Sequence, residues 1–136
     1  MSSTTSNIKI RIVVVDDEPD ILLGLNALLT GRGHYVKTFD KPGQALEHFT
    51  SGVVRYDLVI TDYRMPGGIS GLDLAKQVKE RTRGTKVFLM TAFDVSSLPE
   101  FIEAVNSQIV DETIQKPIPN DKLIAIIEKN FLHNSH

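Results

Sequence analysis

The feature of this sequence that most restricts its fold is a regular alternation of short apolar segments with amphipathic segments. Five apolar or β-branched stretches are typical of strands, and each is followed by a stretch with apolar residues at helical spacing. The predicted strands are residues 8–15, 35–39, 57–61, 87–90 and 109–114. The predicted helices lie around residues 19–31, 41–50, 70–78, 97–105 and 123–131. This alternation predicts an α/β domain with a parallel sheet covered by helices on both faces.

Several helix boundaries carry local start signals. Pro19 stands in an acidic turn and fits a first helical turn, because proline is pre-set for that position and acids complement the helix dipole. Asp40 is expected to cap the second helix. Ser70 and Asp73 have the spacing of a capping box at the start of the third helix.

Length, charge and composition exclude several classes of protein. The 136 residues amount to about one domain. Lys plus Arg number 15 and Asp plus Glu 17, so the net charge of −2 gives no overall basic footprint for nucleic acid or a membrane surface. The chain has no cysteine, which excludes disulfides and thiolate metal sites.

No targeting or membrane segment is evident in the sequence. No apolar run reaches the roughly 18 residues of a transmembrane helix, and the first residues do not form a secretory signal. We therefore expect a cytoplasmic protein that makes no membrane contact. Residues 1–7 are expected to form a flexible tail, residues 8–132 the domain, and residues 133–136 a C-terminal tail.

Polar and charged residues follow four of the predicted strands, at the point where each strand ends. They are Asp16, Asp17 and Glu18 after the first strand, Asp62 after the third, Thr91 after the fourth and Lys116 after the fifth. The carboxyl ends of parallel strands form the ligand-binding edge of such sheets, so these side chains should converge if the first and third strands are neighbours. Taken singly, an aspartate after a strand is usually a turn residue or a helix cap. Their recurrence at equivalent positions favours a shared site.

The residue types at these positions indicate a particular chemistry. Converging carboxylates repel one another unless a cation compensates them. A hard divalent ion such as Mg²⁺ takes oxygen ligands, commonly carboxylates together with water and phosphate. Lysine binds phosphate as a compact charge, and a threonine hydroxyl can donate a hydrogen bond to a phosphoryl oxygen. The set therefore predicts a site for a phosphoryl group and a magnesium ion.

Four segments resemble, in order, the signature segments of the receiver domain of two-component response regulators. They are VVVDDEP at residues 13–19, DLVITDYRMP at 57–66, MTA at 90–92 and QKP at 115–117. The resemblance extends over residues 8–132. It implies a flavodoxin-like, doubly wound fold, with a five-stranded parallel sheet in the strand order 2-1-3-4-5.

The resemblance also implies roles for the residues of the phosphoryl site. Asp62 would accept a phosphoryl group from the phosphohistidine of a sensor histidine kinase or a phosphotransfer protein. Thr91 and Lys116 would hold the phosphoryl oxygens, and Ala92 would keep the entrance open. The peptide bond between Lys116 and Pro117 is usually cis in this family, and a bond to proline is the one kind that adopts cis at low cost.

The resemblance implies a magnesium site in the same place. Asp17 and Asp62 would bind Mg²⁺ directly, with the backbone carbonyl of Arg64 as a third protein ligand. Asp16 would act mainly through a water molecule.

Two positions depart from the family pattern. Thr91 and residue 113 would form the switch, but position 113, commonly aromatic in the family, is Thr113. Phe93 or another residue would then have to report the switch. The loop at 66–71 is one residue longer than usual, which either places Ile69 over the site or adds slack; we favour slack.

The output is expected to be a shift in the balance of conformations at the fourth helix, fifth strand and fifth helix. A downstream protein effector would bind there, and a homodimer through the fourth and fifth helices is also compatible with the resemblance. Only five residues follow Phe131, so we expect no effector module and no direct nucleic-acid contact. The front end of a longer regulator would have the same sequence up to residue 132.

Two other functions stay open. A binding module of the same fold that does not use phosphorylation is supported by Thr113 and opposed by the intact acidic, threonine and lysine set. A magnesium-dependent phosphohydrolase would need a second acid two residues after Asp62, where this chain has Arg64. We expect no enzyme activity beyond self-phosphorylation from a donor and slow self-dephosphorylation.

Overall fold

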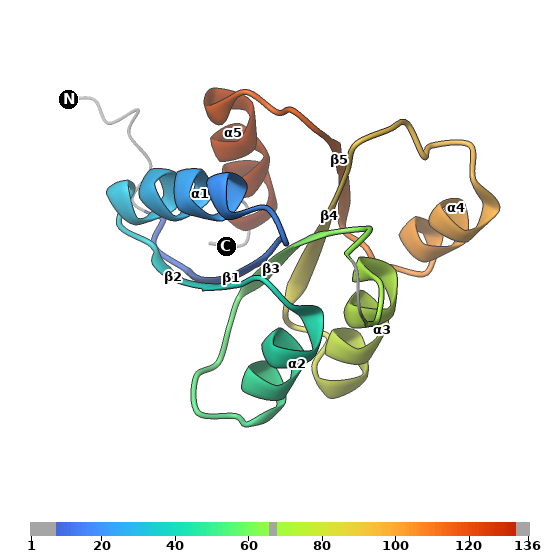
Figure 1. The fold of residues 1–136 in the computed structure, drawn as a ribbon, viewed down its shortest axis with the longest axis horizontal. Helices are drawn as coiled ribbons and strands as arrows, with labels where there is room; N and C mark the ends of the chain where they lie inside the picture. The colour runs from blue at the N-terminus through green and yellow to red at the C-terminus, as the bar shows by residue number, and fades with distance from the viewer. Residues whose placement is uncertain (1–7, 66–67, 133–136) are drawn as a thin grey trace.

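The described residues form five parallel strands in one central sheet (Figure 1). The computed structural model describes residues 8–65 and 68–132; the predicted tails lie outside this range. In chain order the strands are β1 Arg11–Val15, β2 Tyr35–Phe39, β3 Leu58–Asp62, β4 Lys86–Thr91 and β5 Glu112–Gln115. Their order across the sheet is β2-β1-β3-β4-β5, so the predicted topology is confirmed. From β1 the chain builds the sheet first toward β2 and then, from β3 onward, in the other direction. β1 and β3 are paired neighbours, and ligands bind at this point of reversal in such folds.

Helices cover both faces of the sheet (Figure 1). They are α1 Pro19–Gly31, α2 Pro42–Thr50, α3 Gly71–Arg81, α4 Pro99–Asn106 and α5 Asn120–Phe131. Helices α1 and α5 pack on one face, and α2, α3 and α4 pack on the other. None of the described helices is long and apolar enough to span a membrane.

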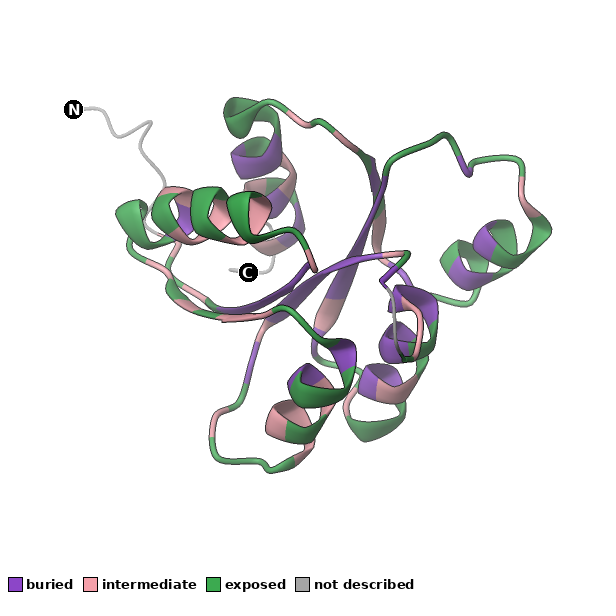
Figure 2. Cartoon of the chain, in the orientation of Figure 1, coloured by how far each residue is buried: buried purple, intermediate pink, exposed green. Residues whose placement is uncertain are grey.

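Two separate apolar cores follow from the alternation of side chains along the strands. In β1, Ile12 and Val14 face α1 and α5, whereas Val13 and Val15 face α2 and α3. The central strand β3 is buried along its whole length, as expected for a strand covered on both faces. Figure 2 shows this burial in the middle of the sheet and on the inner faces of the helices.

The observed strand boundaries differ from the expected ones. β1 begins at Arg11 instead of residue 8, and β5 is limited to Glu112–Gln115. β1 starts where its neighbour starts, because Arg11 pairs with Tyr35, the first residue of β2. A hydrophobic pattern in one segment does not report where its pairing partner begins.

Proline, rather than a capping side chain, sets the start of α1, α2 and α4. Asp40 does not cap α2, contrary to expectation: the N-cap is Lys41 and Pro42 occupies the first turn. α4 likewise begins later than expected, at Pro99. Proline fixes the backbone angle of a first turn and lacks the N–H that a cap would bind. The predicted capping box of α3 is confirmed: Ser70 Oγ accepts a hydrogen bond from the Asp73 N–H at 3.1 Å.

A buried ion pair near the amino ends of β4 and β5 joins these strands to α3. Lys79 Nζ lies 2.9 Å from Asp111 Oδ2, and the two side chains are 7% and 16% exposed. The same carboxylate oxygen accepts a hydrogen bond from the Val87 N–H at 2.8 Å. Removing one member of such a pair leaves an uncompensated charge inside the protein.

Lys79→Ala is therefore expected to lower the free energy of unfolding by about 3 kcal/mol. Lys76→Ala, on the exposed side of the same helix, should change it by less than about 0.5 kcal/mol. Urea unfolding followed by circular dichroism measures both values. Equal destabilisation by the two substitutions would show that the ion pair contributes nothing specific.

Candidate functional site

The carboxyl ends of four strands form a hollow in the surface, which we call the site hollow. Asp62 and Thr91 are the last residues of β3 and β4, while Asp17 and Lys116 follow β1 and β5. The site hollow encloses about 360 Å³. The residues that line it include Asp17, Asp62, Arg64, Thr91, Ala92 and Lys116. Most of the predicted site residues therefore do meet around one space.

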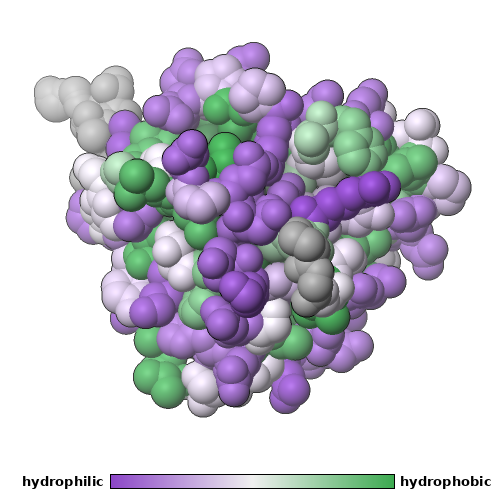
Figure 3. Space-filling view, in the orientation of Figure 1, coloured by the Kyte–Doolittle hydropathy of each residue, from purple (hydrophilic) through white to green (hydrophobic). Residues whose placement is uncertain are grey.

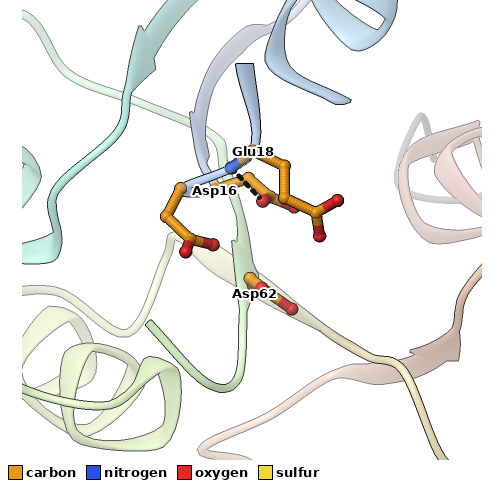
Figure 4. Close-up of side chains that lie close together, drawn as sticks. Asp16, Glu18 and Asp62 are labelled. Atoms are coloured by element: carbon orange, nitrogen blue, oxygen red, sulfur yellow. Dashed lines mark hydrogen bonds between the residues drawn. The ribbon is translucent and has the colours of Figure 1, made fainter. Parts of the chain in front are cut away.

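Four carboxyl groups gather at this edge. Asp16, Asp17, Glu18 and Asp62 each offer one oxygen, and these four oxygens lie within 4.8 Å of one another. Figure 4 shows Asp16 and Glu18 above Asp62 at the ends of β1 and β3. Asp16 is fully buried, and its Oδ1 accepts a hydrogen bond from the Glu18 N–H at 2.9 Å, drawn as the dashed line in Figure 4. Asp16 Oδ2 is buried and accepts no well-aligned hydrogen bond among the described residues.

Lys116 is the cation that faces this cluster. Its Nζ lies 2.9 Å from Asp16 Oδ2, 3.3 Å from Asp62 Oδ1 and 3.4 Å from Glu18 Oε2, so the buried Asp16 oxygen is compensated through an ion pair. Its backbone N–H donates a hydrogen bond to the Thr91 carbonyl at 2.7 Å, which fixes the end of β5 against β4. The peptide bond from Lys116 to Pro117 is cis, as the resemblance implies.

The pKa values of the paired groups reflect the crowding of charge. Burial raises the pKa of Asp62, and the nearby Asp16 raises it further, against the opposing effects of Lys116 and the Tyr63 N–H. Burial by itself would lower the pKa of Lys116, but its contacts with Asp16 and Asp62 outweigh burial and leave that pKa raised. Four carboxylates and one ammonium give a formal charge of −4 + 1 = −3 at this edge. A further cation would relieve the repulsion.

The donors present fit a magnesium ion. Mg²⁺ takes oxygen ligands and is commonly held by one or two carboxylates. The cluster offers carboxylate oxygens only, and one of them, Asp16 Oδ2, is buried without a well-aligned hydrogen bond. Asp17 and Asp62 line the site hollow, as does Arg64, whose carbonyl is the third predicted ligand.

Thr91 and Ala92 both line the site hollow. Thr91 is buried, lines the site hollow and donates its hydroxyl hydrogen bond to the carbonyl of Phe93. Ala92 is exposed at the entrance. Thr113 is exposed in β5, so no aromatic ring stands at the position that is commonly aromatic in the family.

Tyr63 connects Asp62 to α4, a role that the sequence analysis does not identify. Its N–H lies 2.8 Å from the Met90 carbonyl and 3.1 Å from Asp62 Oδ1. Its ring meets Phe101 edge-on at 4.8 Å, and its hydroxyl donates to Glu100 Oε2 at 3.1 Å. The sequence signal for this role is an aromatic residue directly after a strand-end aspartate.

Arg64 stacks on aromatic rings at the rim of the site hollow. Its guanidinium carbon lies 5.2 Å from the centre of the Phe93 ring and 5.7 Å from that of Tyr63. Both separations are in the range of cation–π contacts. The side chain of Arg64 is therefore held against the β4–α4 loop.

Gly71 is a second functional position that the motifs do not reveal. Its N–H donates to the Tyr63 carbonyl at 2.8 Å. A Cβ atom here would lie 2.1 Å from the Asp62 carbonyl oxygen and 2.9 Å from Leu89 Cδ1, closer than such atoms can approach. Glycine therefore lets α3 pack directly on the strand that carries Asp62.

Ile69, in the described part of the longer loop before α3, does not lie over the site. Ile69 packs against the core on the α2 and α3 face and is not among the residues around the site hollow. Pro66 and Gly67 lie outside the described residues.

The fold and the acidic edge define a doubly wound α/β domain with a receiver-type site. The chain belongs to the response regulator receiver domain family of two-component systems, whose sequence profile matches residues 12–128.

Curated relatives support this assignment over most of the chain. The DNA-binding transcriptional regulator NtrC of Escherichia coli is 34% identical over 120 residues, covering 88% of this chain and 24% of NtrC. The transcriptional regulatory protein DltR of Streptococcus agalactiae is 33% identical over 119 residues, covering 86% of this chain and 50% of DltR. The chain thus spans a quarter to a half of the length of these relatives.

Solved structures agree with the fold. The response regulator TrrA of Thermotoga maritima, solved in complex with Mg²⁺–BeF, is 36% identical with a TM-score of 0.73, covering 88% of this chain and 97% of TrrA. A receiver domain from Clostridium thermocellum is 30% identical with a TM-score of 0.80, covering 92% of this chain and 96% of that one.

The close approach of Gly71 to Asp62 predicts a large effect of a single methyl group. Gly71→Ala should lower the free energy of unfolding by about 2 kcal/mol, because overpacking forces the backbone at Asp62 to move. Gly24→Ala in α1, where a Cβ has open space, should be neutral or stabilise by up to about 1 kcal/mol. Urea unfolding of the two variants tests the comparison; a neutral Gly71→Ala would mean that α3 can shift away freely.

Proposed function

We propose that this domain accepts a phosphoryl group on Asp62 from the phosphohistidine of a sensor histidine kinase or a phosphotransfer protein, in a reaction that depends on Mg²⁺. The observation that carries the proposal is the position of Asp62 at the site hollow, with Lys116 Nζ 3.3 Å from its Oδ1. Asp16 is fully buried, and it does not line the site hollow. Of the two aspartates in contact with Lys116, Asp62 is the one that a donor can reach.

The chain's own residues supply most of the chemistry. A carboxylate oxygen of Asp62 attacks phosphorus in line, the bond from phosphorus to the histidine nitrogen breaks, and an acyl phosphate forms. Lys116 binds one phosphoryl oxygen, and the Thr91 hydroxyl donates to another. Asp17, Asp62 and the backbone carbonyl of Arg64 would hold Mg²⁺ directly, and Asp16 through a water molecule; the ion would neutralise charge on the phosphoryl oxygens when bound. Positioning and charge neutralisation are the main sources of catalysis in phosphoryl transfer.

We propose no catalytic turnover beyond this transfer of one phosphoryl group. The domain phosphorylates itself from a donor and loses the group slowly, without acting as a general phosphatase. Arg64 takes the place of the second acid that a phosphohydrolase would use, and its side chain stacks on Phe93. No carboxyl group is therefore supplied from that position to protonate a leaving group.

The output surface that we propose is the face formed by α4, β5 and α5, which would bind a downstream protein. Ile102 and Val105 on α4 are 46% and 44% exposed although both are apolar. A protein partner, or a second copy of the domain, would cover such side chains. We propose a cytoplasmic protein that contacts proteins, and neither membrane nor nucleic acid, through this domain.

Intact-mass measurement after incubation with acetyl phosphate and Mg²⁺ tests the phosphorylation step. We expect one phosphoryl adduct on the wild-type chain and on Asp20→Asn, an exposed aspartate of α1, and none on Asp62→Asn. The adduct should not form when the metal is removed with a chelator. Absence of an adduct with every donor, including a cognate kinase, would leave a phosphorylation-independent binding module. Rapid accumulation of free phosphate would instead indicate a phosphohydrolase.

The proposed metal ligands predict a second result. Asp17→Ala should weaken Mg²⁺ binding by more than about tenfold, because a ligating oxygen is lost, and should reduce phosphorylation in parallel. Asp20→Ala serves as the control in the same helix region and should bind Mg²⁺ as the wild type does. Calorimetric titration with MgCl₂ gives both affinities. An unchanged affinity for Asp17→Ala would contradict the ligand assignment.

A further inference from the structure

The hydroxyl group of Thr91 is already engaged in the structure. It carries a single proton, which it donates to the carbonyl oxygen of Phe93. It cannot donate to a phosphoryl oxygen at the same time. Phosphorylation of Asp62 therefore requires the Thr91 hydroxyl to release Phe93 before it can bind the phosphoryl group.

The ring of Phe93 is held on the outside of the protein. It is 38% exposed, lies under the guanidinium of Arg64 at 5.2 Å and meets the Tyr63 ring edge-on at 6.4 Å. These contacts are weak individually, because cation–π and aromatic pairs at exposed sites contribute little. In Figure 3 apolar side chains gather at the upper right of the molecule, where the β4–α4 loop lies.

A largely apolar cavity lies beside Phe93, between β4, β5 and α4; we call it the α4 cavity. It encloses about 360 Å³, which is larger than a phenyl ring requires. Its lining includes Thr91, Phe93, Phe101, Ile102, Val105 and Thr113. Thr91 and Phe93 thus stand at the boundary between the site hollow and the α4 cavity, since they line both.

The small side chain of Thr113 lines the α4 cavity. Thr113 pairs with Leu89 of β4 and points to the α4 side of the sheet, while its neighbour Ile114 faces α5. A bulky side chain at 113 would occupy this volume. Apolar cavities lack partner atoms on one side, so a ring that enters one gains contacts and leaves water.

We propose that Phe93 is the residue that reports phosphorylation in this protein, by moving into the α4 cavity. When the Thr91 hydroxyl turns to the phosphoryl group, the Phe93 carbonyl is released, and the ring leaves Arg64 to pack between β5 and α4. The ring then contacts Ile102 and Val105, which changes the exposed face of α4. This inference rests on the proposed function, because it requires a phosphoryl group or its mimic on Asp62.

A tryptophan at position 93 reports this movement directly. The chain contains no tryptophan, so Phe93→Trp places a single indole at the boundary of the two cavities, and excitation at the red edge of its absorption avoids the three tyrosines. On addition of Mg²⁺ and beryllium fluoride, a mimic of the phosphoryl group, we expect the emission to shift to shorter wavelength and quenching by acrylamide to decrease. Both changes follow from transfer of the ring out of water, and quenching by acrylamide reports accessibility rather than the added charge.

Filling the cavity provides the matched control. In Phe93→Trp with Thr113→Phe, the ring at 113 should occupy the α4 cavity, so that the indole at position 93 stays accessible in the presence of beryllium fluoride. Phe93→Trp with Thr113→Ser keeps the cavity and should show the full change. Burial of the indole in the filled variant would overturn the assignment of the α4 cavity as its destination.

A second measurement avoids the larger indole ring. The chain has six phenylalanines, which can be labelled with 4-fluorophenylalanine, and the Phe93 resonance is assigned by its loss in Phe93→Leu. Beryllium fluoride should shift this ¹⁹F resonance and lower its exposure to a soluble paramagnetic agent.

The ¹⁹F signal of bound beryllium fluoride separates the two possible failures. If the wild-type chain binds no beryllium fluoride, the proposed function fails and this inference falls with it. If beryllium fluoride binds and residue 93 stays accessible in both measurements, the proposed function stands and the role of Phe93 is overturned.

Discussion

Repulsion among four carboxyl groups at one edge of the sheet is the constraint on which the site depends. Strands β1 and β3 are neighbours, so Asp16, Asp17 and Asp62 are forced together, and Lys116 offsets only part of their charge. Burial raises the pKa of Asp62, and the nearby Asp16 raises it further. A cation that binds among these carboxylates lowers their electrostatic free energy and so stabilises this edge. In the proposed function, Lys116 together with a bound Mg²⁺ would offset the charge of the phosphoryl group.

The surrounding structure holds this edge by backbone contacts more than by side chains. The Tyr63 N–H contacts both a β4 carbonyl and the Asp62 carboxylate, and the Lys116 N–H binds the Thr91 carbonyl. Gly71 allows the start of α3 to touch the backbone of Asp62. Backbone groups have few alternative positions, so they fix the Asp62 carboxylate more firmly than flexible side chains would.

The alternation of strands and helices and the strand-end positions of the site residues are local along the chain, so the sequence predicts them, whereas the strand order is expected from the resemblance to receiver domains. Strand-end positions and short motifs identify Asp62 and Lys116 without knowledge of their neighbours. The Lys79–Asp111 pair and the Tyr63 hydroxyl bond to Glu100 join residues far apart in sequence, and no local pattern encodes them. No local pattern encodes the ends of the strands either, because each end is set by the strand that pairs with it. Asp40 has the chemistry of a cap, but the adjacent Pro42 decides where α2 begins.

The close contact between Gly71 of α3 and the backbone of Asp62 affects how the domain can respond to a displacement at Asp62. The backbone of Asp62 has no room to move toward α3, because even a single methyl group at Gly71 would clash with it. On the β4–α4 side it meets a cavity and a helix of eight residues, of which Phe101 and Ala104 are buried. Packed interiors resist compression, whereas voids yield. The packing next to Asp62 is therefore tighter toward α3 than toward α4, so a displacement at Asp62 would be accommodated more easily on the α4 side.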